Sequence, residues 1–223
     1  YYATKMNIPD IDLTVFERAR PKMKSKEFVP KTLSKDVIDK IEKLDRKLLS
    51  RLESFYVDLF LFSYYTGGMA NIDVAYLTWD CVDKDGNLNY ERIKFPKRAC
   101  MNFNSKARAI VERYKDKCYG NYMLPVFSVK HNTEAKQRGR LKRLYCNLNL
   151  ALRKVQDLIK SDEKITWYAA RGTFITEMLA ADIPPVEVAE MAGNSPNTIY
   201  KHYYKNTNKD QTFKRANAVL GCK

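Results

Sequence analysis

The residues of this chain best suited to chemistry are an arginine and a group of tyrosines, all within residues 165–204. Arg171 lies in an apolar-patterned segment, and Tyr200, Tyr203 and Tyr204 end the stretch in a basic context. A guanidinium can bind phosphate oxygens through paired N–H groups, and a phenol can attack when its neighbours help it lose a proton. We therefore expect Arg171 and one of these tyrosines to meet around a phosphate. The alternatives are a helix-surface arginine and tyrosines that pack in the core.

The amino-acid composition indicates which kinds of partner the chain can bind. The 223 residues include 40 Lys plus Arg against 26 Asp plus Glu, a formal charge of +14. This balance favours a polyanion, nucleic acid before a membrane surface. The longest apolar run, VDLFLFSYY, is too short to span a bilayer. The five cysteines are widely spaced and only two histidines accompany them, so we expect no metal site and reduced thiols in a cytoplasm.

The elements that must position these residues are predicted to be mostly helices. Apolar periodicity, capping residues and prolines predict helices after Ser34, at about 51–66, from Asn71, from Ser105 to about 117, and at 133–159, 168–182, 185–193, 196–204 and 207–221. Asp85-Gly86, between segments of alternating character, predicts a turn in a hairpin or small sheet. The expected fold is mainly α with a small antiparallel β-sheet.

The helix predicted at 133–159 has one strongly basic side. Opposite its leucines it carries five cations, Lys136, Arg138, Arg140, Lys142 and Arg143. We expect this side to face a phosphate backbone, the alternative being a solvated face. Residues 1–31 have no sustained period and are predicted to be a linker, either a basic arm or a solvated tether.

From about Thr32 to its last residue the chain resembles the catalytic domain of the tyrosine recombinase, or phage integrase, family, and most of all integrases of Bacteroides-group mobile elements. Four ordered motifs carry the resemblance: GMANIDVAYLTWDCV (68–82), NYERIK (89–94), ITWYAARGTFIT (165–176) and AGNSPNTIYKHYY (192–204). It implies that 32–223 is the catalytic domain and that 1–31 is a linker following an absent core-binding domain.

The resemblance also implies roles for single residues. Tyr203 maps to the nucleophile, Arg171 to the arginine that stabilises the transition state, and Lys94 to the general acid at the end of a strand. Tyr168 and Asn194 occupy two positions where the family has histidines, and Ala70 stands where its first arginine would be. Either neighbouring tyrosine remains an alternative nucleophile, and Lys94 is one of many cations in its region.

The implied activity is site-specific recombination, for integration or excision of a mobile element. DNA strands are cleaved and rejoined through a covalent 3′-phosphotyrosyl intermediate, without metal or other cofactor. The implied partners are double-stranded DNA and further copies in a synaptic tetramer, to which 207–221 contributes in trans or else packs in cis. The implied location is the bacterial cytoplasm, at the nucleoid. The alternatives are a non-enzymatic DNA-binding module, either a degenerate recombinase domain or a directionality factor, and an RNA-binding protein.

Overall fold

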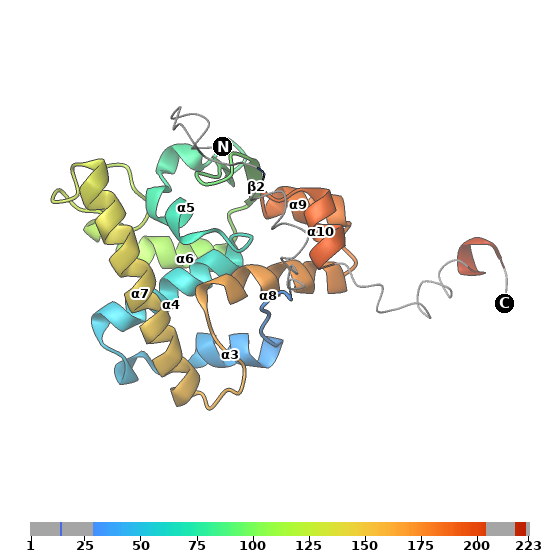
Figure 1. Ribbon diagram of the computed structural model, residues 1–223, viewed down its shortest axis with the longest axis horizontal. Helices are drawn as coiled ribbons and strands as arrows, with labels where there is room; N and C mark the ends of the chain where they lie inside the picture. Colours follow the sequence, from blue (N-terminus) through green and yellow to red (C-terminus); the bar gives the residue numbers. More distant parts are fainter. Residues whose placement is uncertain (1–13, 15–28, 204–216, 222–223) are drawn as a thin grey trace.

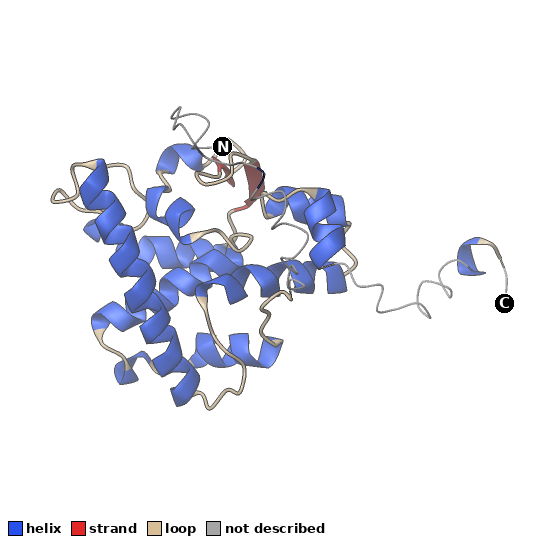
Figure 2. Cartoon of the chain, viewed as in Figure 1, coloured by secondary structure: helices blue, strands red, loops and turns tan. Residues whose placement is uncertain are grey.

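The computed structural model describes residues 14, 29–203 and 217–221, and this part of the chain is mostly helical, with one small sheet at its edge (Figure 2). The longer helices and strands are α3 (Lys35–Lys43), α4 (Arg51–Tyr65), α5 (Asn71–Tyr76), β1 (Asn87–Glu91), β2 (Arg98–Asn102), α6 (Ser105–Tyr114), α7 (Glu134–Leu158), α8 (Trp167–Ala180), α9 (Pro185–Met191) and α10 (Pro196–His202). The predicted fold class is confirmed. The predictions for 1–31 and 207–221 lie largely outside the described residues.

Helix α4 is the centre of the core (Figure 1). It begins with a capping box: the Ser50 hydroxyl accepts from the Glu53 N–H at 3.2 Å, and the Glu53 carboxylate accepts from the Ser50 N–H at 2.7 Å. Residues 55–63 are all buried. Because it is apolar on all sides, α4 can pack against α6, α7 and α8 at once, and these helices are positioned relative to one another through it.

Two of the predicted helix starts are displaced by one residue. Helix α3 is capped by Ser34 as predicted. Asn71, predicted as a cap, is instead the first residue of α5, whose N-cap is Ala70 and has no side-chain cap. The cap of α6 is Asn104, whose side chain accepts from the Ala107 N–H at 3.0 Å, so Ser105 is already helical. For α6, Asn104 and Ser105 are both good caps, and the backbone entering the helix decides between them, whereas the cap of α5 is an alanine that offers no side-chain acceptor.

The sheet is an antiparallel hairpin whose turn lies elsewhere than predicted. Strands β1 and β2 pair with Leu88 opposite Met101. The Asp85-Gly86 turn does form, because the Asp83 carboxylate accepts from two backbone N–H groups there. This turn precedes β1, however, and the segments on its two sides pair only through an isolated bridge between Val82 and Leu88. The strands are joined instead through 92–97, so these residues form the exposed end of the hairpin.

Helices α8, α9 and α10 lie together on one side of α4 (Figure 1). Helices α9 and α10 each have a proline at the first helical position, as predicted, although both end earlier than expected. Helix α8 packs on α4 and is tied to the chain before α3, since the Leu33 N–H donates to the Thr173 hydroxyl at 2.8 Å. This packing places the first half of α8 inside the domain, with Arg171 on it.

Candidate active site

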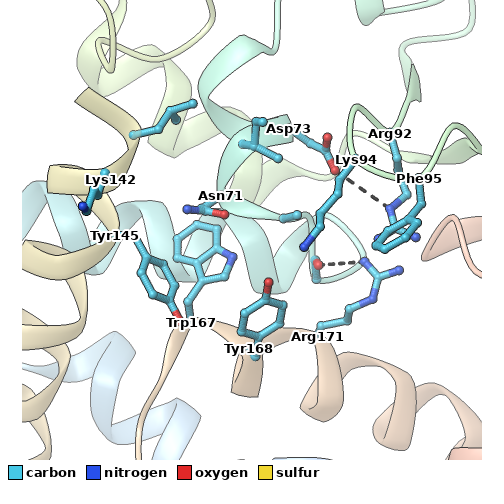
Figure 3. Close-up of a pocket in the computed structure, with 14 residues that line it drawn as sticks. Asn71, Asp73, Arg92, Lys94, Phe95, Lys142, Tyr145, Trp167, Tyr168 and Arg171 are labelled. Carbon is cyan, nitrogen blue, oxygen red and sulfur yellow. Dashed lines mark hydrogen bonds and ion pairs between the residues drawn. The ribbon is translucent and has the colours of Figure 1, made fainter. Parts of the chain in front are cut away.

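An open pocket of about 360 Å³ lies where α8, the turn between α4 and α5, helix α7 and the β1–β2 loop approach one another (Figure 3). Its lining residues are Gly68, Ala70, Asn71, Ile72, Asp73, Arg92, Lys94, Phe95, Leu141, Lys142, Tyr145, Trp167, Tyr168 and Arg171. Three of the predicted catalytic residues, Lys94, Tyr168 and Arg171, are therefore brought together from distant parts of the sequence.

Arg171 is held by three segments. Its Nη1 donates to the Gly68 carbonyl at 3.0 Å, and its Nη2 donates to the Ala192 carbonyl and to Asn194 Oδ1, the latter at 2.9 Å. A guanidinium has five N–H groups, so the Nε–H and one Nη1–H stay available to a ligand. Burial, and next the charge of Arg92, lower the pKa of Arg171 to about 10. It remains a cation at neutral pH, pre-positioned by backbone carbonyls.

Lys94 reaches the pocket from the β1–β2 loop. Its side chain extends toward Tyr168 and Arg171 (Figure 3), and Lys94 as a whole is exposed to solvent. The sequence placed it at the end of a strand, but β1 ends at Glu91, because the Ile93 N–H donates to Asp73 Oδ1 at 2.9 Å instead of to a neighbouring strand. That hydrogen bond anchors the loop on α5 and directs Lys94 into the pocket.

Asp73 is the acid of this pocket. It is buried, and burial raises its pKa, while the bond from Ile93 and the charge of Arg92 act in the opposite direction. Among the described residues that line the pocket it is the one carboxylate, against the cations Arg92, Lys94, Lys142 and Arg171. The pocket is thus suited to an anionic ligand.

Tyr168 and Asn194, at the two positions expected for histidines, differ in placement. Tyr168 is half exposed, and its ring lies between Arg171 and Trp167 with the hydroxyl toward the pocket (Figure 3). Asn194 lies in the turn between α9 and α10 and does not line the pocket. Its Oδ1 accepts from both Arg171 and Arg92, so the amide orients the two guanidinium groups.

Tyr203 lies at the C-terminal end of α10, where its N–H donates to the Ile199 carbonyl at 2.9 Å. It is partly buried against the core and is not among the pocket-lining residues. Burial raises the pKa of Tyr203, and the positive charge of Arg171 opposes that rise. Tyr200 is half exposed, and Tyr204 lies outside the described residues.

The five predicted DNA-binding cations lie on α7, and the structure gives them different surroundings. Lys142 is exposed and lines the pocket, and Arg143 is exposed. Arg138 forms an ion pair with Glu134 at 3.3 Å, and Lys136 Nζ donates to Asn132 Oδ1 at 2.9 Å. Arg140 is partly buried and donates from Nε to the Val126 carbonyl at 3.0 Å. Lys142 and Arg143 are the two that combine exposure with neither an ion pair nor a side-chain hydrogen bond among the described residues.

Arg92 and Trp167 are among the pocket residues that sequence reasoning missed. Arg92 precedes Lys94 in the same motif, but nothing in the sequence separates it from the many other cations nearby. Trp167 is 2% exposed, and its indole nitrogen faces the pocket without a hydrogen-bond partner among the described residues (Figure 3). An aromatic residue at the start of a buried helix reads as core, so its polar edge gave no signal.

The described part of the chain lacks two other kinds of site. No group of His, Cys, Asp and Glu side chains there is arranged to hold a metal ion. None of the helices described is both long and apolar enough to cross a membrane.

Comparison with known proteins gives a likeness in structure. No family model matches the sequence, and no curated protein matches it. A crystal structure of XerA recombinase superposes with a TM-score of 0.56 at 14% identity, covering 100% of this chain and 89% of that one. The Tn1549 transposon integrase in complex with transposon right end DNA gives 0.57 at 14% identity, covering 96% and 71%.

A second structure of the Tn1549 integrase, in complex with a circular intermediate DNA, gives a TM-score of 0.59 at 12% identity, covering 96% of this chain and 75% of that one. At such identities a likeness reports the path of the backbone and not the chemistry. The chain has the fold of a tyrosine recombinase catalytic domain.

Proposed function

We propose that this chain is the catalytic domain of a site-specific DNA recombinase that cleaves and rejoins strands through a covalent 3′-phosphotyrosyl intermediate. Tyr203 is the nucleophile, Arg171 stabilises the charge that develops on the non-bridging phosphate oxygens, and Lys94 is the general acid. Tyr168 donates a hydrogen bond to the phosphate, and Asn194 holds Arg171 in position. The reaction integrates or excises a mobile element, in the cytoplasm and on nucleoid DNA.

One observation supports this function above the others: Arg171 and Lys94 line the same cationic pocket, and the charge of Arg171 opposes the rise that burial causes in the pKa of Tyr203. These residues come from the hairpin loop, α8 and α10, which are widely separated in the sequence. A phosphodiester carries one negative charge at neutral pH and gains a second in the transition state. A pocket with four cations and one buried acid is suited to that change.

These groups account for each bond and each proton in the proposed cleavage step. The Tyr203 oxygen attacks phosphorus and its proton passes to water, a new P–O bond forms to the tyrosine, and the bond from phosphorus to the 5′ oxygen breaks. Lys94 gives a proton to the departing 5′ oxygen. In the rejoining step a 5′ hydroxyl attacks the phosphotyrosine, and the proton transfers run in reverse.

Double-stranded DNA is the proposed partner, and further copies of the chain join it in a synaptic tetramer. The exposed Lys142 and Arg143 on α7 extend the cationic surface away from the pocket, which supports contact with phosphates on either side of the cleaved one. The segment 207–221 is proposed to pack on a neighbouring copy.

The nucleophile is tested with a duplex nicked close to the cleavage site, from which the short 5′ product diffuses away and leaves the covalent complex trapped. The wild-type chain is expected to form an adduct that survives denaturing electrophoresis. Tyr203→Phe should abolish it and leave DNA affinity nearly unchanged. The controls are Tyr200→Phe, half exposed on the same helix, and Tyr204→Phe. A robust adduct from Tyr203→Phe, or its loss in Tyr204→Phe, would reassign the nucleophile.

Lys94 is tested by changing the leaving group. Lys94→Ala should slow cleavage by about 10² to 10⁴-fold, the range of general acid catalysis. A substrate with sulfur at the bridging 5′ position should restore most of that loss, because a thiolate leaves without being protonated. Lys97→Ala, exposed in the same loop, is the matched control. Equal loss on both substrates would remove Lys94 from this role.

No adduct from the wild-type chain on any duplex, together with salt-dependent binding, would favour the second function, a DNA-binding module without activity. The single buried acid and the two substituted histidine positions are compatible with either outcome, and the gel decides between them.

A further inference from the structure

A second guanidinium lies beside Arg171 in the pocket. Arg92 directly follows β1, and its N–H donates to the Lys97 carbonyl at 3.0 Å across the neck of the hairpin loop. Its side chain is 14% exposed and lines the same pocket, pointing toward Arg171 (Figure 3). The two arginines share an acceptor, Asn194 Oδ1, at 3.4 Å from Arg92 Nη1 and 2.9 Å from Arg171 Nη2.

The hydrogen-bonding capacity of Arg92 is only partly used. Its Nη1 donates to the Gly193 carbonyl at 2.6 Å as well as to Asn194. Its Nε is buried and has no hydrogen-bond partner, since the nearest Asp73 oxygen is 3.9 Å away. Its Nη2 makes no hydrogen bond within the described chain. A guanidinium this deeply placed normally has most of its donors paired, so unused donors here indicate a place for an acceptor.

The charges around Arg92 also indicate a place for an anion. Two arginines and Lys94 lie around one buried carboxylate, and burial disfavours the charge of that carboxylate while the charge of Arg92 lowers the pKa of Arg171. Like charges held together without enough counter-charge destabilise the empty pocket. An anion between the two guanidinium groups would relieve their repulsion. The indole N–H of Trp167 also faces the pocket (Figure 3) and adds a neutral donor for the same ligand.

Close contacts with neighbouring backbone segments fix the position of Arg92. A Cβ added to Gly193 would lie 2.6 Å from Arg92 Cδ and 3.0 Å from Ala99 Cβ, so the stem of the arginine runs directly along this glycine. Asp73 fixes the other side through Ile93. In the turn between α4 and α5, the residues that line the pocket are Gly68 and Ala70, and neither has a charged side chain.

We propose that Arg92 binds the same phosphodiester as Arg171, supplying from the hairpin the second guanidinium that the Ala70 side of the pocket lacks. The proposal rests on the proposed function for the identity of the phosphate as the one cleaved. Arg92 contacts a non-bridging oxygen through Nη2, and Arg171 contacts the phosphate through its Nε–H and remaining Nη1–H.

The first test compares Arg92→Ala, Arg92→Lys and Arg98→Ala in single-turnover cleavage of the nicked duplex. Arg98 lies on the same hairpin but is exposed and bonds to Asn89 at 2.5 Å, so it is the matched control. Removing one preorganised donor to a transition-state oxyanion costs about 10² to 10³ in rate. Arg92→Ala should lose that much, Arg92→Lys should recover part of it, and Arg98→Ala should stay within about threefold of wild type.

The second test separates a contact from a merely structural role. A methylphosphonate at the cleaved position replaces one charged oxygen by a neutral methyl group, so a group that acts by neutralising charge loses most of its effect. The ratio of wild-type to Arg92→Ala rates should fall from the first test's value to below about tenfold. An Arg92→Ala variant that cleaves like wild type, or that is slowed equally on both substrates, would overturn the proposal.

A third measurement tests the binding of an anion by Arg92 without relying on DNA cleavage. Inorganic phosphate should raise the melting temperature of the wild-type chain and of Arg98→Ala, and this rise should be largely lost in Arg92→Ala. If the wild type forms no adduct with any duplex, the proposed function fails. An unchanged phosphate response in Arg92→Ala would then overturn the anion site as well, whereas a lost response would support it.

Discussion

Replacing Gly68 by alanine tests how closely the α4–α5 turn must approach α8 to form the pocket. Gly68 has a φ of +69°, and a Cβ there would lie 2.2 Å from Arg171 Cα, against an ordinary contact distance of at least 3.4 Å. The atom it meets belongs to the backbone of a buried helix, which cannot turn aside as a side chain can. The two backbones would have to separate by about 1 Å.

The cost has two parts that can be estimated separately. The positive φ costs an L-residue about 1 to 2 kcal/mol, and overpacking of a well-packed site costs about 1 to 3 kcal/mol more. The expected loss in the free energy of unfolding is therefore about 2 to 5 kcal/mol. For a domain of this size that is a fall in melting temperature of roughly 5 to 15 °C. Cleavage should fall too, because the Gly68 carbonyl that positions Arg171 is displaced.

Two other glycines provide matched controls in urea or thermal unfolding. Gly120 has a φ of +58° with nothing within 4 Å of an added Cβ, so Gly120→Ala carries the backbone strain without the clash. Gly139 lies in α7 with open space around it, so Gly139→Ala should stabilise the chain by about 0.5 to 1 kcal/mol. If Gly68→Ala proves as stable as Gly120→Ala, the close approach of the turn to Arg171 is refuted.

Three further predictions concern charge. Lys142→Ala should reduce the slope of log affinity for DNA against log salt concentration by about 0.9, which corresponds to the loss of one phosphate contact. Arg138→Ala should change this slope less, because Arg138 forms an ion pair within its own helix. The Ser50 N–H, and then Lys154, hold the pKa of Glu53 at about 2, so its stabilisation is fully present above its ordinary pKa of 4.5 and is lost as pH falls toward 2. Urea midpoints measured down this range should therefore depend less on pH in Glu53→Gln than in wild type. Asp58→Asn should destabilise by about 2 kcal/mol in the same assay, less than for a fully buried ion pair, because the arginines that pair with this 2%-exposed residue are partly exposed. A loss below about 0.5 kcal/mol would contradict that reasoning.

The helices were predictable because each carries its own signal. Ser34, Pro185 and Pro196 are start signals that act locally, and the apolar run of α4 predicts burial without knowledge of its neighbours. The cap of α6 was wrong by one residue because Asn104 and Ser105 could each serve, and a local pattern does not decide between them. The cap of α5 was wrong because that helix begins after Ala70, which has no capping side chain and so gives no signal in the sequence.

The site was predictable only in part, for a related reason. Lys94, Tyr168 and Arg171 were identified from motifs, and the structure brings them into one pocket. Arg92 was missed because its direction is set by the bend at 92–97 and by its contact with Gly193, both of which depend on tertiary structure. The catalytic roles of all these residues stay predictions until the adduct experiments are done.

The hydrogen bonds of Arg171 have a consequence for how this chain would change over generations. Because that side chain joins the α4–α5 turn to the α9–α10 turn, selection for folding alone would retain it, even in a relative without the proposed cleavage activity. Lys94 is exposed and forms no ion pair among the described residues, so folding gives little reason to keep it. In relatives of this chain, a retained lysine in the hairpin loop would therefore be better evidence of surviving activity than a retained arginine in α8.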